Sequence, residues 1–293
     1  MSNAGSDGPA ISLCALRRLE QLQLAASRRL VGAVAGEHRA PRHGSTLDFA
    51  DFREYQPGDD VRRIDPHQLA RLDVLRIKLF EGDEDLVVRV LLDTSESMTM
   101  HGKRRIATAV TAALGAVALT SGDSLSLVAF PAAPVPRRFI GRHGVPELVD
   151  ALDRLPWGGS TPFARTVRQV LNRPGPPGMT VVVSDLLTTE WRTAVSRLPA
   201  RRADLLVVHV GARREIEPEL FGDLELEDSE SGEQIPVSLT PEQLAGYRDR
   251  RRTWVAEVRR RCHEVGGRYL TVDAEDDVEQ VLLRSWRTSG VLR

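Results

Sequence analysis

Three oxygen-bearing side chains follow a hydrophobic strand at a spacing of two residues. The segment from Leu86 to Met98 reads LVVRVLLDTSESM and places Asp93, Ser95 and Ser97 directly after its apolar part. In an extended segment alternate side chains point the same way, so a carboxylate and two hydroxyls at this spacing can converge on one point. Oxygen ligands of this kind suit Mg²⁺ or Mn²⁺. The segment therefore predicts a divalent-cation site at the end of a strand.

Two other segments offer further oxygen ligands. A second apolar strand, MTVVVSD, ends at Asp185, and the glycine-rich loop 158–161 brings Thr161 just ahead of a predicted helix. In an open parallel sheet, ligands collect at the carboxyl ends of the strands, near the point where strand order reverses. We therefore expect these two residues to join the first three around one cation. The alternative is that the first three only cap the helix that follows them.

Strand and helix patterns alternate along most of the chain. Strands are predicted at 74–80, 86–92, 125–130, 179–184, 205–210 and 268–272, and helices at 11–34, 104–120, 145–155, 162–171, 190–198, 241–265 and 276–286. This alternation is typical of a doubly wound α/β sheet that is mostly parallel. Within 221–239, alternating apolar residues on each side of Ser231-Gly232 predict an inserted β-hairpin. Residues 36–55 are charged and are expected to be irregular.

The length of 293 residues allows one large domain, or one domain with a substantial extension. The predicted organisation is a disordered leader at 1–9, a helical and strand extension at 10–85 packed on the core, and the α/β domain at 86–293 with its hairpin near 221–239. The leader is small, polar and glycine-containing, with nothing to pack.

Composition excludes several classes of function. The formal net charge of −1 gives no field that would favour nucleic acid or anionic lipid. Cys14 and Cys262 are far apart in the sequence and lack the paired spacing of zinc-binding cysteines, which favours a reducing compartment. No signal peptide is recognisable, and the longest apolar run, at 106–119, falls short of the roughly 20 residues that cross a bilayer. We expect a soluble, cytoplasmic protein. Lys78 and Lys103 are the only lysines among 40 basic residues, a bias that we attribute to genome composition.

The five candidate ligands together resemble a known site. The von Willebrand factor type A fold carries a metal-ion-dependent adhesion site with the pattern Asp-x-Ser-x-Ser, then a Thr, then an Asp. The resemblance implies that five residues hold the ion: Asp93, Ser95, Ser97, Thr161 and Asp185. Some of them would bind it directly, and the aspartates would bind it partly through water. It also implies an open coordination position that a Glu or Asp of a partner protein fills. Neutral hydroxyl ligands leave much of the cation's charge uncompensated, which favours such a partner.

The segment 49–80 carries a second, more specific resemblance. Nine residues match in order the hallmark of the bacterial domain-of-unknown-function family fifty-eight: Arg53, Tyr55, Gly58, Asp59, Arg62, Ile64, Asp65, Ala70 and Arg71. Pro66 stands where this family usually has Trp. The resemblance implies a type A core and a frequent association with AAA+ ATPases of the MoxR type, in pairs that act as chaperones or assembly factors.

The charged residues of this segment follow one another closely. We interpret them as a buried ion-pair network that clamps the extension to the sheet, formed by Arg53, Asp59, Arg62, Arg63, Asp65 and Arg71. A partner-docking surface is the functional alternative.

Three hypotheses for the function follow. The first is a non-enzymatic, Mg²⁺-dependent protein-binding module. The second is a metal-dependent hydrolase that uses the same ion, with Glu96 and His101 as local candidates for the general base. The third is a structural α/β domain whose metal site takes no ligand. Phosphatase, nucleophile-elbow, Walker, dinucleotide-binding and His-Glu-x-x-His patterns are missing from the sequence.

Overall fold

The computed structural model describes residues 48–54, 76–81, 87–131, 133–172, 178–198, 204–281 and 286. Contacts divide them into two units, one within Leu30–Asp85 and the other within Leu86–Arg293. The leader, the helix predicted at 11–34 and the packing of the extension on the core lie outside what is described, and these remain predictions.

The smaller unit contains an antiparallel pair of strands, β1 (Asp48–Glu54) and β2 (Arg76–Glu81). The sequence predicted β2, but the expectation of irregular backbone was wrong for β1. Its register shifts between Phe49 and Asp51. Such a bulge breaks the period of two, which hides the strand from a search for strict alternation.

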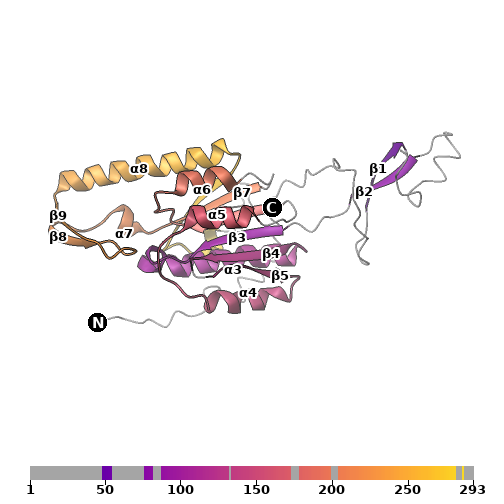
Figure 1. The fold of residues 1–293 in the computed structure, drawn as a ribbon, viewed down its shortest axis with the longest axis horizontal. Helices are drawn as coiled ribbons and strands as arrows, with labels where there is room; N and C mark the ends of the chain where they lie inside the picture. The colour runs from indigo at the N-terminus through magenta and orange to yellow at the C-terminus, as the bar shows by residue number, and fades with distance from the viewer. Residues whose placement is uncertain are drawn as a thin grey trace. The chain divides into compact units, whose positions relative to one another are not determined.

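A six-stranded sheet forms the centre of the larger unit (Figure 1). Its strands are β3 (Val87–Asp93), β4 (Ser124–Phe130), β5 (Ala133–Ile140), β6 (Gly178–Ser184), β7 (Asp204–Gly211) and β10 (Arg268–Asp273). They lie in the order β10-β7-β6-β3-β4-β5, and every neighbouring pair is parallel except β4 and β5. The prediction of a doubly wound, mostly parallel α/β sheet is confirmed.

The strand order reverses at β3. This strand pairs with β4, the next strand along the chain, on one side and with β6 on the other. In open α/β sheets such a reversal leaves a crevice beyond the strand ends, because the flanking connections run to opposite sides. The end of β3, at Asp93, is therefore the place where the fold favours a ligand.

The antiparallel edge strand β5 was not predicted. Its sequence, APVPRRFI, contains Pro134 and Pro136, which cannot donate to a strand ladder. Proline is tolerated at a sheet edge, where one side of the strand needs no partner, so the edge position accounts for both residues.

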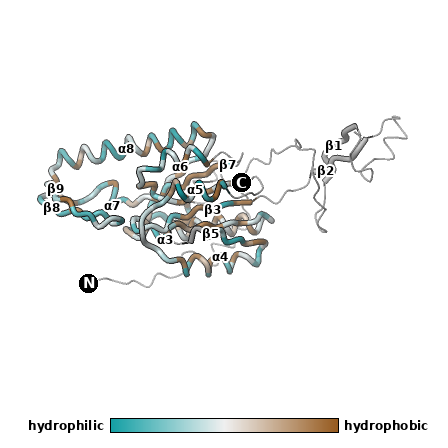
Figure 2. Tube along the Cα trace, in the orientation of Figure 1, coloured by the Kyte–Doolittle hydropathy of each residue, from teal (hydrophilic) through white to brown (hydrophobic). Residues whose placement is uncertain are grey.

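Helices cover both faces of the sheet. In Figure 1, α5 (Phe163–Leu171), α6 (Trp191–Arg197) and α8 (Pro241–Glu264) lie on one face, and α3 (Lys103–Thr120) and α4 (Gly144–Asp153) on the other. Side chains of β3 alternate between two hydrophobic clusters: Val90 and Leu92 pack with α3, whereas Leu91 packs with α5 and α6. In Figure 2 the central strands are the brown, hydrophobic part of this unit, and α8 is teal over much of its length.

The long helix α8 begins at a capping box. The Thr240 hydroxyl accepts from the Gln243 backbone N at 3.3 Å, and the Gln243 side chain accepts from the Thr240 N at 2.9 Å. Pro241 follows as the first helical residue, where its missing N–H costs nothing. These local signals explain why the sequence located the start of α8 correctly.

The predicted hairpin is present as β8 (Gly222–Glu227) and β9 (Gln234–Leu239), an antiparallel pair. Three short elements complete the unit: a 3-10 helix, η2 (Ser97–Gly102), and the helices α7 (Arg213–Ile216) and α9 (Val278–Gln280). Of the helix predicted at 276–286, residues 276–281 and 286 are described, and the helix begins only at Val278. Across the residues that the structure describes, no helix has the length and apolar character of a membrane span.

Candidate metal centre

Asp93 ends β3 with a fully buried carboxylate. Its Oδ1 accepts from the Ser95 backbone N at 3.0 Å, and its Oδ2 accepts from the Ser184 hydroxyl at 2.6 Å. Ser184 is the last residue of the neighbouring strand β6. Both carboxylate oxygens are therefore oriented by the ends of two adjacent strands, which fixes the side chain at the reversal point.

The two serines of the motif lie beside this carboxylate, but in a loop rather than in extended backbone. Ser95 Oγ and Ser97 Oγ are 3.2 Å apart, and both residues are buried. The backbone leaves the strand after Asp93 and turns into η2. The assumption of a continued strand was therefore wrong, and the turn of the chain brings the two hydroxyls together.

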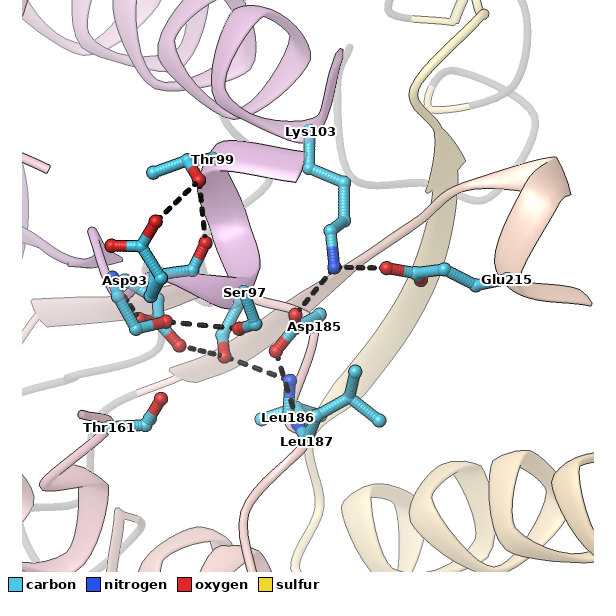
Figure 3. A network of polar contacts seen from close by, with 12 residues as sticks. Asp93, Ser97, Thr99, Lys103, Thr161, Asp185, Leu186, Leu187 and Glu215 are labelled. Atoms are coloured by element: carbon cyan, nitrogen blue, oxygen red, sulfur yellow. Dashed lines mark hydrogen bonds and ion pairs between the residues drawn. The ribbon is translucent and has the colours of Figure 1, made fainter. Parts of the chain in front are cut away.

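The glycine-rich loop is tied to the serine loop by two backbone hydrogen bonds. Gly158 N donates to Thr94 O at 2.8 Å, and Glu96 N donates to Gly159 O at 2.9 Å. Gly158 and Gly159 have φ values of 131° and 83°, which L side chains rarely adopt. These bonds bring the loop that carries Thr161 next to the motif (Figure 3), and the Thr161 hydroxyl donates to Glu230 Oε1 at 2.6 Å.

Asp185, which directly follows β6, is paired with a buried ammonium group (Figure 3). Lys103 Nζ donates to Asp185 Oδ2 at 2.8 Å and also to Glu215 of α7, and its side chain is fully buried. The other oxygen, Oδ1, accepts from Leu187 N at 3.1 Å. This carboxylate is thus neutralised and held by groups of the chain itself.

The electrostatics of Asp93 are different. Burial and, to a lesser extent, the nearby charge of Asp185 raise the pKa of Asp93, while hydrogen bonds from Ser184 and Ser95 lower it, and together they bring this pKa to about 7. Among the described residues, no positively charged side chain appears as a cause of this shift. A carboxylate in this state lacks a counter-charge, which a bound cation would supply.

The donor set fits a hard cation at Asp93. One buried carboxylate and three hydroxyl groups, those of Ser95, Ser97 and Thr161, offer the oxygen ligands that Mg²⁺ or Mn²⁺ prefers. Within the described ranges, no three His, Cys, Asp or Glu side chains gather into a metal-binding group. The candidate centre accordingly depends on hydroxyl ligands, and Asp185 remains a predicted ligand whose Oδ2 already accepts from Lys103.

Four residues of this region were not identified from the sequence. Ser184 directly precedes Asp185, so its strand-end position was a usable signal. Lys103 was noticed as one of two lysines, but the bias was attributed to genome composition. Glu215 lies in a segment without a recognisable motif, and Glu230 lies in the predicted hairpin, but no local pattern connects either residue to the site.

Most residues of the family motif lie outside the part of the chain that the structure describes. Arg53 lies in β1, which is described by its backbone. Outside the described residues lie Tyr55, Gly58, Asp59, Arg62, Asp65 and Arg71. The predicted ion-pair network among them stays a prediction.

A pocket of about 580 Å³ lies apart from the candidate centre, between α8 and the ends of β7 and β10. Its lining includes Arg248, Arg251 and Arg259, but also Glu217 and Asp273. Both acidic and basic groups therefore line it, and none of the five predicted metal ligands does. This pocket and the candidate metal centre are therefore two different sites in the fold.

Residues 51–260 match the family described as "Protein of unknown function DUF58". The chain belongs to this family. The match spans both the segment before β2 and most of the α/β unit, as the resemblance of the charged motif implied. Two mycobacterial relatives, Rv1480 of Mycobacterium tuberculosis H37Rv and Mb1516 of Mycobacterium bovis, both described as uncharacterized, are each 30% identical over 234 residues. The aligned part covers 76% of this chain and 73% of each relative.

Two solved structures are similar in outline to this DUF58 protein. BatB from Bacteroides thetaiotaomicron aligns with a TM-score of 0.39 and 13% identity, over 69% of this chain and 98% of that one. An aerotolerance-related membrane protein from Bacteroides fragilis aligns with a TM-score of 0.42 and 15% identity, over 70% and 98% of the two chains. No functional property is transferred from either.

Proposed function

We propose that this DUF58 protein is a Mg²⁺- or Mn²⁺-dependent protein-binding module without catalytic activity. Its partner offers an acidic side chain to the ion, and a cytoplasmic AAA+ ATPase of the MoxR type is the partner that we propose from the family resemblance. In this role the pair assists the assembly of other complexes. The observation that carries the proposal is the buried Asp93 carboxylate, which accepts from Ser95 N and the Ser184 hydroxyl at the strand-order reversal and has no described ion pair.

The chain's own residues divide the work of such a site. Asp93 supplies the negative charge, while Ser184 and the Ser95 N–H orient its two oxygens. Ser95, Ser97 and Thr161 would add neutral oxygen ligands. A bound cation with this ligand set supplies an uncompensated positive charge that attracts a carboxylate.

The position of Lys103 supports a binding role for the site and argues against Asp185 as a catalytic base. Its ammonium engages Asp185, so this aspartate is not a free base for activating water. Glu96, one of the two bases considered for a hydrolase, accepts from the Thr99 hydroxyl through its backbone O at 2.7 Å and its Oε1 at 3.4 Å. His101, the other, lies on an exposed, left-handed position of η2 with φ of 54°.

A pull-down with a matched control tests the proposal. The wild type, Asp93→Ala and Asp150→Ala are each offered to a MoxR-type ATPase of the same organism, with Mg²⁺ or with a chelator. Asp150 is an exposed acid of α4, so its loss changes the net charge equally without touching the site. We expect Mg²⁺-dependent capture by the wild type and Asp150→Ala, and at least a tenfold loss for Asp93→Ala.

The same three proteins are assayed for phosphoesterase turnover, because the hydrolase is the competing hypothesis. Turnover that Asp93→Ala abolishes while capture of the ATPase is unchanged would refute the binding role and favour the enzyme. Calorimetry with Mg²⁺ and Mn²⁺ addresses the structural hypothesis: a wild type that binds neither ion has no metal-dependent function of either kind.

A further inference from the structure

A carboxylate of the chain itself already contacts the candidate centre. Glu230 lies between the two strands of the β8–β9 hairpin, 69 residues from Thr161. Its Oε1 accepts from the Thr161 hydroxyl at 2.6 Å, and its Oε2 accepts from the Thr161 backbone N at 3.0 Å. Hydrogen bonds to an ionised acceptor are among the stronger ones in proteins, and two on one residue fix its orientation.

The hairpin is built to present this one residue. Asp228 Oδ1 accepts from the backbone N of Glu230 at 3.0 Å and of Ser231 at 2.7 Å, which closes a tight turn. Gly232, with φ of 72°, completes the turn in a conformation that glycine tolerates. The tip is therefore pre-organised, and it holds the Glu230 side chain on the Thr161 side.

Burial along the hairpin points to the same residue. From 225 to 236 every residue is exposed except Glu230, which is half-buried. Two apolar side chains on the strands, Leu226 and Ile235, are 41% and 52% exposed. Leu224, Val237 and Leu239, nearer the base of the hairpin, are partly buried, so apolar side chains anchor the base. At the exposed tip, the contact with Thr161 is made by Glu230.

The chemistry of this contact matches what the proposed site takes from a partner. The open position is expected to accept a Glu or Asp oxygen, and Glu230 brings such an oxygen to one of the proposed ligands. We infer that the β8–β9 hairpin is the site's built-in ligand, with Glu230 in the place of the partner's acid, so that a partner must displace it. This inference rests on the proposed metal-dependent binding and adds its regulation.

Mn²⁺ is a suitable probe because it reports the exchangeable water molecules on the ion through water-proton relaxation. The wild type, Glu230→Gln and Glu233→Gln are compared as full-length chains. Glu233 is an exposed acid of the same turn, so its replacement removes the same charge without a contact to Thr161. Circular dichroism first establishes that all three are equally folded.

We expect Mn²⁺ in Glu230→Gln to carry about one more exchangeable water than in the wild type, and Glu233→Gln to match the wild type. A tethered ligand acts at an effective concentration in the millimolar range, so an external acid should compete poorly with it. N-acetylglutamate amide should therefore lower the relaxation of the Glu230→Gln protein at roughly tenfold lower concentration than that of the wild type.

The outcomes separate the two claims. Binding of Mn²⁺ with identical relaxation and identical competition in all three proteins would overturn the built-in ligand and leave the metal-dependent module standing. Absence of Mn²⁺ binding in the wild type and in Glu230→Gln alike would overturn the module, and the inference with it. Binding that appears only when Glu230 is replaced would support the metal site but overturn the built-in ligand, because Glu230 would then exclude the ion and not coordinate it.

Discussion

Two carboxylates lie at neighbouring strand ends of the same sheet, and the fold treats them differently. Asp185 has a buried lysine, Lys103, whose ammonium also reaches Glu215. Asp93 has hydrogen bonds from Ser95 and Ser184 but no described cation, and burial raises its pKa to about 7. Asp185 thus has an ion pair within the chain, whereas Asp93 has none among the described residues and is the carboxylate that we propose as the ligand of a cation.

This difference suggests a division of labour. A buried ion pair with several hydrogen bonds fixes one geometry, because moving either partner leaves a buried charge unpaired. A buried carboxylate without a cation costs folding free energy until an ion arrives. The Lys103 side therefore stabilises the frame, whereas the Asp93 side is where binding free energy can be gained.

The largest expected effect comes from breaking the ion pair of Asp185. Lys103→Met keeps most of the side-chain volume but leaves Asp185 and Glu215 without their ammonium. Removing one partner of a buried pair typically destabilises a protein by about 3 to 5 kcal/mol. Urea unfolding monitored by circular dichroism measures this loss. The exposed Arg154, whose pair with Asp150 is 3.4 Å long, provides the control Arg154→Met, which should change stability by less than about 0.5 kcal/mol.

The two aspartates should respond in opposite directions when no metal is present. Asp185→Asn leaves Lys103 poorly compensated and should cost about 2 to 3 kcal/mol. Asp93→Asn removes a buried, uncompensated charge and should be neutral or stabilising by about 1 kcal/mol at pH 8. Unfolding of both variants in a chelator tests this contrast. Equal destabilisation by the two changes would mean that the two aspartates are not distinct in this respect.

Metal affinity should depend on pH through Asp93. Without metal, its folded pKa is about 7, above the ordinary 3.8, so the folded protein holds a proton that the unfolded chain has released. The metal-free protein therefore loses stability as pH rises through this window, and Mg²⁺ must displace the proton below pH 7. The Mg²⁺ affinity should rise up to about tenfold per pH unit below pH 7 and level off above it.

Calorimetric titrations at pH 6, 7 and 8 measure this dependence. The Asp150→Ala protein, which lacks an exposed acid of α4 outside the site, should show the same pH dependence as the wild type. An affinity that does not change between pH 6 and pH 8 would show that Asp93 is not the group displaced by the ion.

The smallest expected effect concerns the loop that carries Thr161. Gly159 has φ of 83°, so Gly159→Ala introduces a side chain into a left-handed conformation. The cost should be about 1 kcal/mol of stability. Because Gly159 O accepts from Glu96 N, the change should also weaken Mg²⁺ binding several-fold through a displaced Thr161. Gly122, which has a φ of 92° and open space around its Cβ position, gives a matched control, Gly122→Ala, that should affect stability alone.

Local patterns determined much of this protein. Apolar runs of strand length placed Asp93 and Asp185 at strand ends, because a fully covered parallel strand must be hydrophobic until it leaves the sheet. Alternation of apolar residues around Ser231-Gly232 located the hairpin, since strand pairing and turn chemistry act over a few residues. The strands β1 and β5 were missed because each breaks the local pattern of a strand. In β1 a bulge interrupts the alternation, and in β5 two prolines are tolerated because the strand lies at the edge of the sheet.

The tertiary structure decided how those pieces meet. Lys103 reaches Asp185 across 82 residues and Glu215 across 112, and Glu230 reaches Thr161 across 69. Such contacts depend on where a helix begins over the sheet and how far a hairpin extends, and neither is encoded within a window of the sequence. The sequence by itself determined that oxygen ligands gather at one edge of the sheet. Only the packing of distant segments decided that Asp185 is paired with Lys103, that Asp93 is buried without a described ion pair, and that Glu230 contacts Thr161.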